Sequence, residues 1–121
     1  EREVFVVHGG LSRVPEVGLE RLRTLPNWRQ HFPVGDHAAW SEDEAILFDA
    51  LWADPHPLTG LRVSKRGAMV MEFGRDVTAE FLERSGLRLV IRSHEAPRSG
   101  RGFRLMHSDQ LLTVFSASNY G

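Results

Sequence analysis

The chain of 121 residues is long enough for one small domain with a hydrophobic core, and its hydrophobic content of 41% is ordinary for a globular protein. The net charge of −1 gives no general attraction to nucleic acid or to an anionic membrane, and no apolar run reaches the length that spans a bilayer. Because the chain has no cysteine, a disulfide framework and a thiolate metal site are excluded, which favours the cytoplasm as its location, with the nucleus as the alternative.

The first expected element is a strand at residues 3–8, where four consecutive apolar residues precede His8 and the pair Gly9-Gly10. A run of this kind is typical of a strand that is buried on both faces. Residues 17–24 then predict a short helix. Residues 25–39 predict an irregular segment, because two prolines and a glycine interrupt it.

The clearest helix is expected to begin after Ser41, which forms a capping-box pattern with Glu44. Apolar residues then recur at helical spacing up to Trp52, and Asp54-Pro55 ends the helix because a residue before proline avoids the α region. The remaining pattern predicts a loop at 56–65, a strand at 68–71, a helix at 76–85 closed by Gly86, a strand at 87–91, and a hairpin of strands 103–107 and 110–115 around Ser108-Asp109.

These elements predict a single mixed α/β domain in which helices cover a sheet. The sequence contains no internal repeat, low-complexity tract or domain boundary. Both ends of the chain lie directly beside an expected strand, and the chain does not begin with methionine. We therefore expect residues 1–121 to be a fragment of a longer protein, truncated at both ends.

Two histidines share a place that suits a metal ligand, because each follows the end of an expected strand. His8 ends the first strand, and His94 follows Arg92-Ser93 after strand 87–91. Neutral imidazole is a common metal donor, although a hydrogen-bonded structural histidine is the ordinary alternative. Two histidines do not complete a zinc-type site, which takes three or four protein ligands. Further donors would come from outside this chain or from its other acidic and histidine side chains: Asp36, Asp54, Glu95, His31 and His37.

Three further side chains are candidates for binding a substrate. Arg66 lies between Lys65 and Gly67, where a guanidinium could bind a phosphate with two hydrogen bonds or simply be solvated. Arg92 interrupts an apolar strand, so it is either buried and paired or directed into a cleft. Tyr120 follows the last expected strand, as a cleft residue or as an ordinary loop tyrosine.

Taken together, six short segments in this order resemble the second half of the phosphoprotein phosphatase family, the metal-dependent protein serine/threonine phosphatases that include calcineurin. The resemblance covers nearly the whole chain and is nearest to the family branch that carries EF-hands. The segments are Val7-His8-Gly9-Gly10-Leu11-Ser12, Leu51-Trp52-Ala53-Asp54-Pro55, Lys65-Arg66-Gly67, Phe73-Gly74, Ile91-Arg92-Ser93-His94-Glu95 and Thr113-Val114-Phe115-Ser116-Ala117-Ser118-Asn119-Tyr120.

The resemblance implies the α/β metallophosphoesterase fold, a β-sandwich flanked by helices, of which residues 1–121 form the C-terminal part. It also implies a hydrolase of phosphoserine and phosphothreonine in proteins, with two metal ions that could be manganese, iron or zinc. In the family, the histidines that match His8 and His94 bind the same metal ion, and the arginine that matches Arg66 holds the substrate phosphate. The tyrosine that matches Tyr120 lines the cleft, and the aspartate that matches Asp54 lies near it.

The motifs of the family's first half, which supply the other metal ligands, a second arginine and a catalytic histidine, are absent from this sequence. The resemblance therefore implies that the isolated chain is inactive, and that the partners of this chain are phosphorylated protein substrates and the missing N-terminal half of the same domain. The alternative is a catalytically degenerate module that binds phosphopeptides or acts as a scaffold. Because half of a two-sheet sandwich leaves one face uncovered, we also expect an exposed apolar patch or self-association of this chain.

Overall fold

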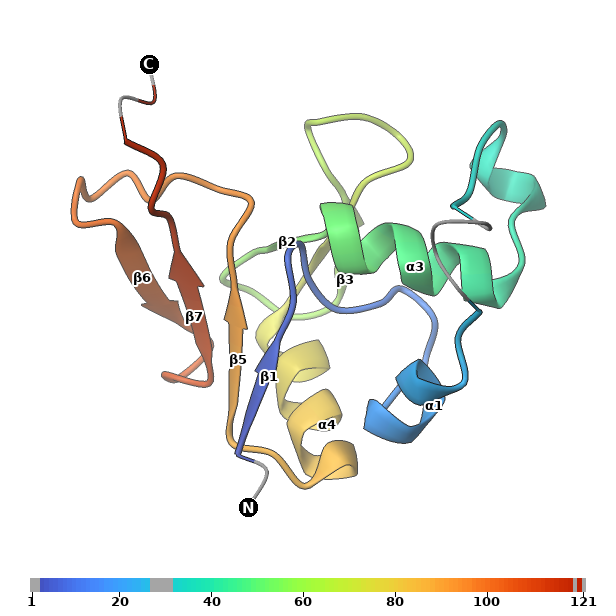
Figure 1. The fold of residues 1–121 in the computed structure, drawn as a ribbon, viewed down its shortest axis with the longest axis horizontal. Helices are drawn as coiled ribbons and strands as arrows, with labels where there is room; N and C mark the ends of the chain where they lie inside the picture. The colour runs from blue at the N-terminus through green and yellow to red at the C-terminus, as the bar shows by residue number, and fades with distance from the viewer. Residues whose placement is uncertain (1–2, 27–31, 119, 121) are drawn as a thin grey trace.

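The computed structural model describes residues 3–26, 32–118 and 120, and it folds into two sheets with three α-helices (Figure 1). The four-stranded sheet has the order β1-β5-β7-β6, and the three-stranded sheet has the order β2-β4-β3. Within the described residues, no helix is both long and apolar enough to cross a membrane. The strands are β1 (Val4–Val6), β2 (Asp54–Pro55), β3 (Leu61–Val63), β4 (Met71–Phe73), β5 (Leu89–Arg92), β6 (Phe103–Met106) and β7 (Leu111–Val114).

The inner face of the four-stranded sheet carries the main core. Phe5, Val90, Leu111 and Met106 lie in one row across the four strands, because β1, β5 and β7 run parallel and β6 pairs antiparallel with β7. This row packs with Phe81 of α4 (Arg75–Ser85) in the hydrophobic core. The sheet and α4 therefore bury their apolar faces against each other.

The opposite face of the same sheet is exposed and apolar. Val6, Ile91, Leu112 and Leu105 form the next row, and Val6 is 72% exposed. The prediction that the first strand is buried on both faces is therefore wrong, because β1 is an edge strand with an uncovered outer side. The apolar patch expected of half a sandwich is present here, and self-association stays a prediction. The other exposed apolar residues on this face are Val4, Phe103 and Val114.

The three-stranded sheet differs most from the sequence prediction. Residues 56–65 were predicted as a loop but contain β3, and the strand predicted at 68–71 instead begins at Met71. The alternation Leu61-Arg62-Val63 is too short to reveal β3 in the sequence, and all three of its residues are exposed. β2 includes Pro55, which a sheet tolerates because β2 lies at its edge.

The helices largely follow their sequence signals. Ser41 and Glu44 form the predicted capping box at the start of α3 (Glu42–Trp52), and Gly86 ends α4 in the left-handed conformation with φ of 66°. α1 is shorter than predicted, at Leu19–Arg23, and a short 3₁₀ segment, His37–Ala39, precedes α3.

The C-terminal hairpin forms as predicted, except that His107 belongs to the turn. Residues 107–109 all have positive φ, and the His107 ring is buried. Its Nε2 donates to the carbonyl of His56 at 2.7 Å, and its Nδ1 lies 2.7 Å from the hydroxyl of Thr78. This turn therefore joins the hairpin to α4 and to the segment after β2.

Candidate functional site

The pair Gly9-Gly10 brings the end of β1 against the last turns of α3. The Gly9 amide donates to the carbonyl of Ala50 at 2.8 Å, and the Gly10 amide donates to the carbonyl of Asp49 at 3.2 Å. A Cβ atom on Gly9 would lie 2.4 Å from the backbone of Leu51, so only glycine permits this approach. As a result, His8 lies beside the chain that leaves α3 toward β2.

The parallel pairing of β1 and β5 brings the two strand-end histidines together. The Ser93 amide donates to the carbonyl of His8 at 3.0 Å, which extends the pairing beyond the strands. The ring centroids of His8 and His94 lie 5.1 Å apart with an interplanar angle of 66°. The Trp52 ring lies edge-on to His94, with centroids 5.2 Å apart.

His94 has an unusual backbone conformation and an unusual side-chain environment. Its φ is 70°, which is unusual for a residue with a side chain, and its Nε2 atom is buried without a hydrogen-bond partner among the described residues. Burial lowers the pKa of the imidazole below its ordinary value; Asp54 acts in the opposite sense, and the cations Arg66 and Arg92 lower it further. His94 therefore favours the neutral form, which is the form that ligates metals.

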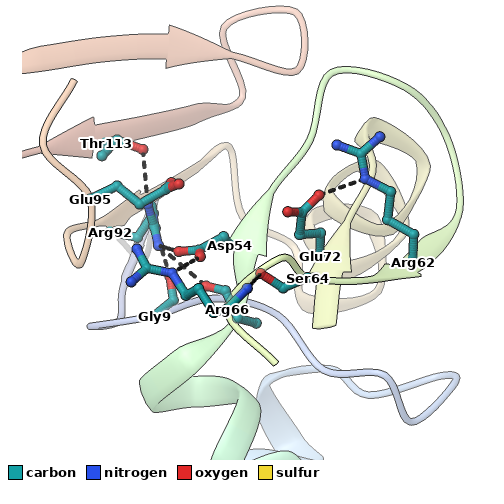
Figure 2. Close-up of polar contacts among 10 residues, drawn as sticks. Gly9, Asp54, Arg62, Ser64, Arg66, Glu72, Arg92, Glu95 and Thr113 are labelled. Atoms are coloured by element: carbon teal, nitrogen blue, oxygen red, sulfur yellow. Dashed lines mark hydrogen bonds and ion pairs between the residues drawn. The ribbon is translucent and has the colours of Figure 1, made fainter. Parts of the chain in front are cut away.

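The charges that act on His94 belong to a second cluster, whose centre is Asp54. Figure 2 shows Asp54 between Arg66 and Arg92. Asp54 accepts from Arg66 Nε through Oδ2 at 2.6 Å and from Arg92 NH2 through Oδ1 at 2.8 Å. The Asp54 side chain is buried, whereas that of Arg66 is 40% exposed. Arg66 comes from the loop between β3 and β4, so three separate segments meet at this carboxylate.

Arg92 is fully buried and paired, which decides between the two alternatives left open by the sequence. Besides Asp54, it donates to the carbonyls of Gly9 at 2.7 Å and Ala53 at 3.2 Å. Its NH1 donates to the carboxylate of Glu95 at 2.7 Å. Burial raises the pKa of Glu95, and the neighbouring Asp54 charge adds to that effect. The buried Arg92 side chain therefore connects β5 by hydrogen bonds to the Gly9-Gly10 turn, which we call the glycine turn, and to the end of α3.

Arg66 differs from Arg92 because one edge of its guanidinium is open. Its Nε is bound to Asp54, and its backbone amide donates to the hydroxyl of Ser64 at 3.1 Å. No hydrogen bond from its terminal nitrogens is formed within the described part of the chain. Two parallel N–H donors are thus left to face an anion.

The remaining predicted site residues do not join these clusters. Tyr120 is 75% exposed, and its ring lies against Phe115 with centroids 5.0 Å apart. Asp36 and His37 lie next to each other near the short 3₁₀ segment, with Asp36 Oδ1 and His37 Nδ1 3.7 Å apart. His31 falls outside the described residues. Over residues 3–26, 32–118 and 120, no group of three or more histidine and acidic side chains could hold a metal ion.

Sequence reasoning missed two partners of these residues. Glu95 was considered only as a metal donor, although its spacing of three residues from Arg92 could have indicated an ion pair. The second is Asp49, which is completely buried and binds Arg13 through both of its carboxylate oxygens. The sequence pattern that could have indicated a buried carboxylate is the position of Asp49 as the only acidic residue among the apolar residues 45–52 of the helix.

Comparison with known proteins gives a consistent match. The family described as Metallophos, calcineurin-like phosphoesterase, matches residues 1–98. Serine/threonine-protein phosphatase T of Trypanosoma brucei brucei is 40% identical over 98% of this chain and 22% of its own length. Serine/threonine-protein phosphatase 5 of Arabidopsis thaliana is 41% identical over 98% of this chain and 20% of its own length. The chain thus spans about a fifth of these relatives.

A solved structure agrees with the sequence matches. A protein serine/threonine phosphatase from Saccharomyces cerevisiae, described as similar to human phosphatase PP5, superposes with a TM-score of 0.77 at 36% identity. The alignment covers 98% of this chain and 33% of that one, and it confirms the predicted α/β metallophosphoesterase fold. The predicted nearness to the branch with EF-hands is not confirmed. The match over residues 1–98 and the shared fold show that the chain belongs to the calcineurin-like phosphoesterase family.

Proposed function

We propose that these residues form the C-terminal part of the catalytic domain of a metal-dependent protein serine/threonine phosphatase. The observation that carries the proposal is the meeting of two imidazoles, 5.1 Å apart, beside an exposed arginine oriented by a buried aspartate. The names of the relatives support the same activity. None of those names favours the alternative of a degenerate phosphopeptide-binding or scaffolding module.

His8 and His94 are the residues of this chain that would hold a metal ion. The Nε2 of His94, buried and without a hydrogen-bond partner among the described residues, fits a ligand atom, and the lowered pKa of the ring favours the neutral form that can bind a metal. Because two imidazoles are too few for a binuclear centre, the other ligands would come from the first half of the domain. Bound metal ions, whether manganese, iron or zinc, would supply charge neutralisation and an activated water.

Arg66 is the residue that we infer binds the substrate phosphate. Asp54 holds its Nε, so the guanidinium presents its two terminal nitrogens as a preoriented fork. Lys65 adds positive charge beside it. Asp54 then acts through Arg66 as a positioning residue, and the buried Arg92 holds Asp54 in place from the other side.

Tyr120 is proposed to line the cleft only once the rest of the domain is in place, because its ring here lies on Phe115 and is largely exposed. The substrates would be proteins phosphorylated on serine or threonine. The isolated chain is expected to be inactive, and we place the full-length protein in the cytoplasm or the nucleus.

The experiment compares two variants of the full-length protein with a matched control. Arg66→Ala and His94→Asn should each lower kcat/KM for a phosphoserine peptide, assayed with Mn²⁺, by about 100-fold or more. Arg62→Ala is the control, because Arg62 lies four residues away in β3 and pairs with Glu72 at 2.5 Å, without a hydrogen bond to Asp54 or Arg66 among the described residues. Near-normal turnover by Arg66→Ala or His94→Asn, with the protein folded, would contradict the site assignment.

A further inference from the structure

Arg13 is held in the structure far more tightly than its place in a loop after β1 requires. Its side chain is 19% exposed, and it binds the completely buried carboxylate of Asp49 in α3. Its NH2 donates to Asp49 Oδ1 at 2.6 Å, its Nε donates to Oδ2 at 3.0 Å, and its backbone amide donates to Oδ2 at 2.7 Å. The carboxylate thus receives both the side chain and the backbone of the same arginine.

Arg13 also reaches the loop that carries Arg66. Its NH2 donates to the carbonyl of Met69 at 2.6 Å. Met69 lies three residues after Arg66 in the segment 64–70, which we call the Arg66 loop. One guanidinium therefore binds the helix through a carboxylate and the loop through a backbone carbonyl.

The surroundings of Arg13 limit its freedom to move. Its guanidinium carbon lies 5.7 Å from the ring centroid of Trp40 and 5.9 Å from that of Phe48. Contacts of this kind favour a cation over an aromatic face and restrict the side chain further. Arg13 therefore forms a restrained link between α3 and the Arg66 loop.

The Arg66 loop has few other hydrogen bonds to described residues outside it, although Ser64 and Val70 at its two ends are buried. Within it, the Ser64 amide donates to the carbonyl of Val70 at 2.8 Å, and the Val70 amide donates to that of Gly67 at 3.1 Å. These bonds close the loop on itself but do not fix it to the rest of the protein. Among the described residues, the hydrogen bonds that leave this loop are those of Met69 to Arg13 and of Arg66 to Asp54.

We propose that Arg13 is a positioning residue that anchors the Arg66 loop to α3 and so sets the place of the phosphate-binding guanidinium. Both contacts tie the Arg66 loop to the same part of the protein, because Asp49, the partner of Arg13, lies in α3 and Asp54, the partner of Arg66, follows the end of α3. The role assigned to Arg66 rests on the proposed function. Without Arg13, the loop would have to be ordered when phosphate binds, and that cost would weaken binding.

The test uses the full-length protein with Arg13→Gln and Arg13→Lys, and with Arg62→Lys as a matched control in the neighbouring strand. For Arg13→Gln we expect the inhibition constant of inorganic phosphate and the KM of a phosphoserine peptide to rise about tenfold, equivalent to about 1.4 kcal/mol. The value of kcat should stay within about twofold. Arg13→Lys should fall between, because an ammonium can pair with Asp49 but lacks the second arm for Met69.

A purely structural role would give a different pattern. If Arg13→Gln lowers kcat in proportion to the folded fraction and leaves the phosphate inhibition constant unchanged, the proposal is wrong. An equal change in Arg62→Lys would also overturn it, since Arg62 does not contact Arg13 or Met69.

Hydrogen exchange separates this proposal from the proposed function. In Arg13→Gln, the amides of Gly67 and Val70 should exchange faster, while amides of β5 and β7 stay protected. If the wild-type protein neither hydrolyses the phosphopeptide nor binds phosphate, the proposed function fails. Faster exchange at those two amides would still support the anchoring of the loop, and unchanged exchange would refute it.

Discussion

Replacing Asp54 by alanine should be among the most destabilising substitutions in this chain. Asp54 is buried and pairs with Arg92, whose side chain has no exposed surface. Removing one partner of a buried ion pair typically costs about 3–5 kcal/mol, because the remaining charge is left uncompensated. Arg92 keeps its bonds to Glu95, Gly9 and Ala53, so we expect the lower part of that range. Asp54→Asn keeps an acceptor oxygen in place and should cost about 1–3 kcal/mol.

The assay is urea unfolding of the full-length protein, followed by tryptophan fluorescence, and the free energy of unfolding is compared between variants with equal slopes. The control is Asp43→Ala, because Asp43 pairs with Arg21 on the surface, where both side chains are at least one-third exposed. An exposed pair of this kind should contribute no more than about 1 kcal/mol. If Asp54→Ala costs no more than Asp43→Ala, the reasoning about the buried network is refuted.

Two further predictions concern stability alone. Burial lowers the pKa of His107, so the unfolded chain takes up the proton first as the pH falls, and stability should decrease from about pH 6.5 downward until the folded-state pKa is passed. The slope of the unfolding free energy between pH 7 and 5 should therefore be smaller in His107→Gln, and an equal slope would contradict the assignment. Gly9→Ala should cost about 1–3 kcal/mol or more, because its Cβ meets rigid backbone of α3 at 2.4 Å. Gly18→Ala should cost less in the same denaturation experiment, because its Cβ meets side-chain atoms, those of Arg84 at 2.9 Å and Ser85 Oγ at 3.4 Å, which can shift where backbone cannot.

Elements with strong local signals could be predicted from the sequence. The capping box of Ser41 and Glu44 and the left-handed Gly86 depend on hydrogen bonds or φ values within a few residues, so the sequence alone indicates them. β3 could not be found in this way. Its three exposed residues form a strand only because β4 offers a partner, and such pairing is a tertiary property.

The site shows the same division between local and tertiary signals. The position of His8 and His94 at the ends of neighbouring strands follows from two apolar runs and from parallel pairing, and the structure brings the rings together. The Arg13–Asp49 pair spans 36 residues, and no local pattern reports which acid a loop arginine will bind. The buried state of Arg92 likewise depends on the glycine turn, whose carbonyl accepts from it.

Two features of the described residues, an unpartnered polar atom and an uncovered apolar face, would both be explained by a further part of the domain packed on the four-stranded sheet. The Nε2 atom of His94 is buried but has no partner in the part of the chain that the structure describes, and the outer face of the four-stranded sheet is apolar but uncovered. The two features are near each other in the fold, since Val6 and Ile91 of the outer face are paired close to the ends of β1 and β5, and His8 and His94 follow those ends. A further sheet packed on that outer face would bury the apolar row, and we expect its loops to end near the histidines. On the proposed function, this chain supplies one side of the site and the rest of the domain supplies the other side.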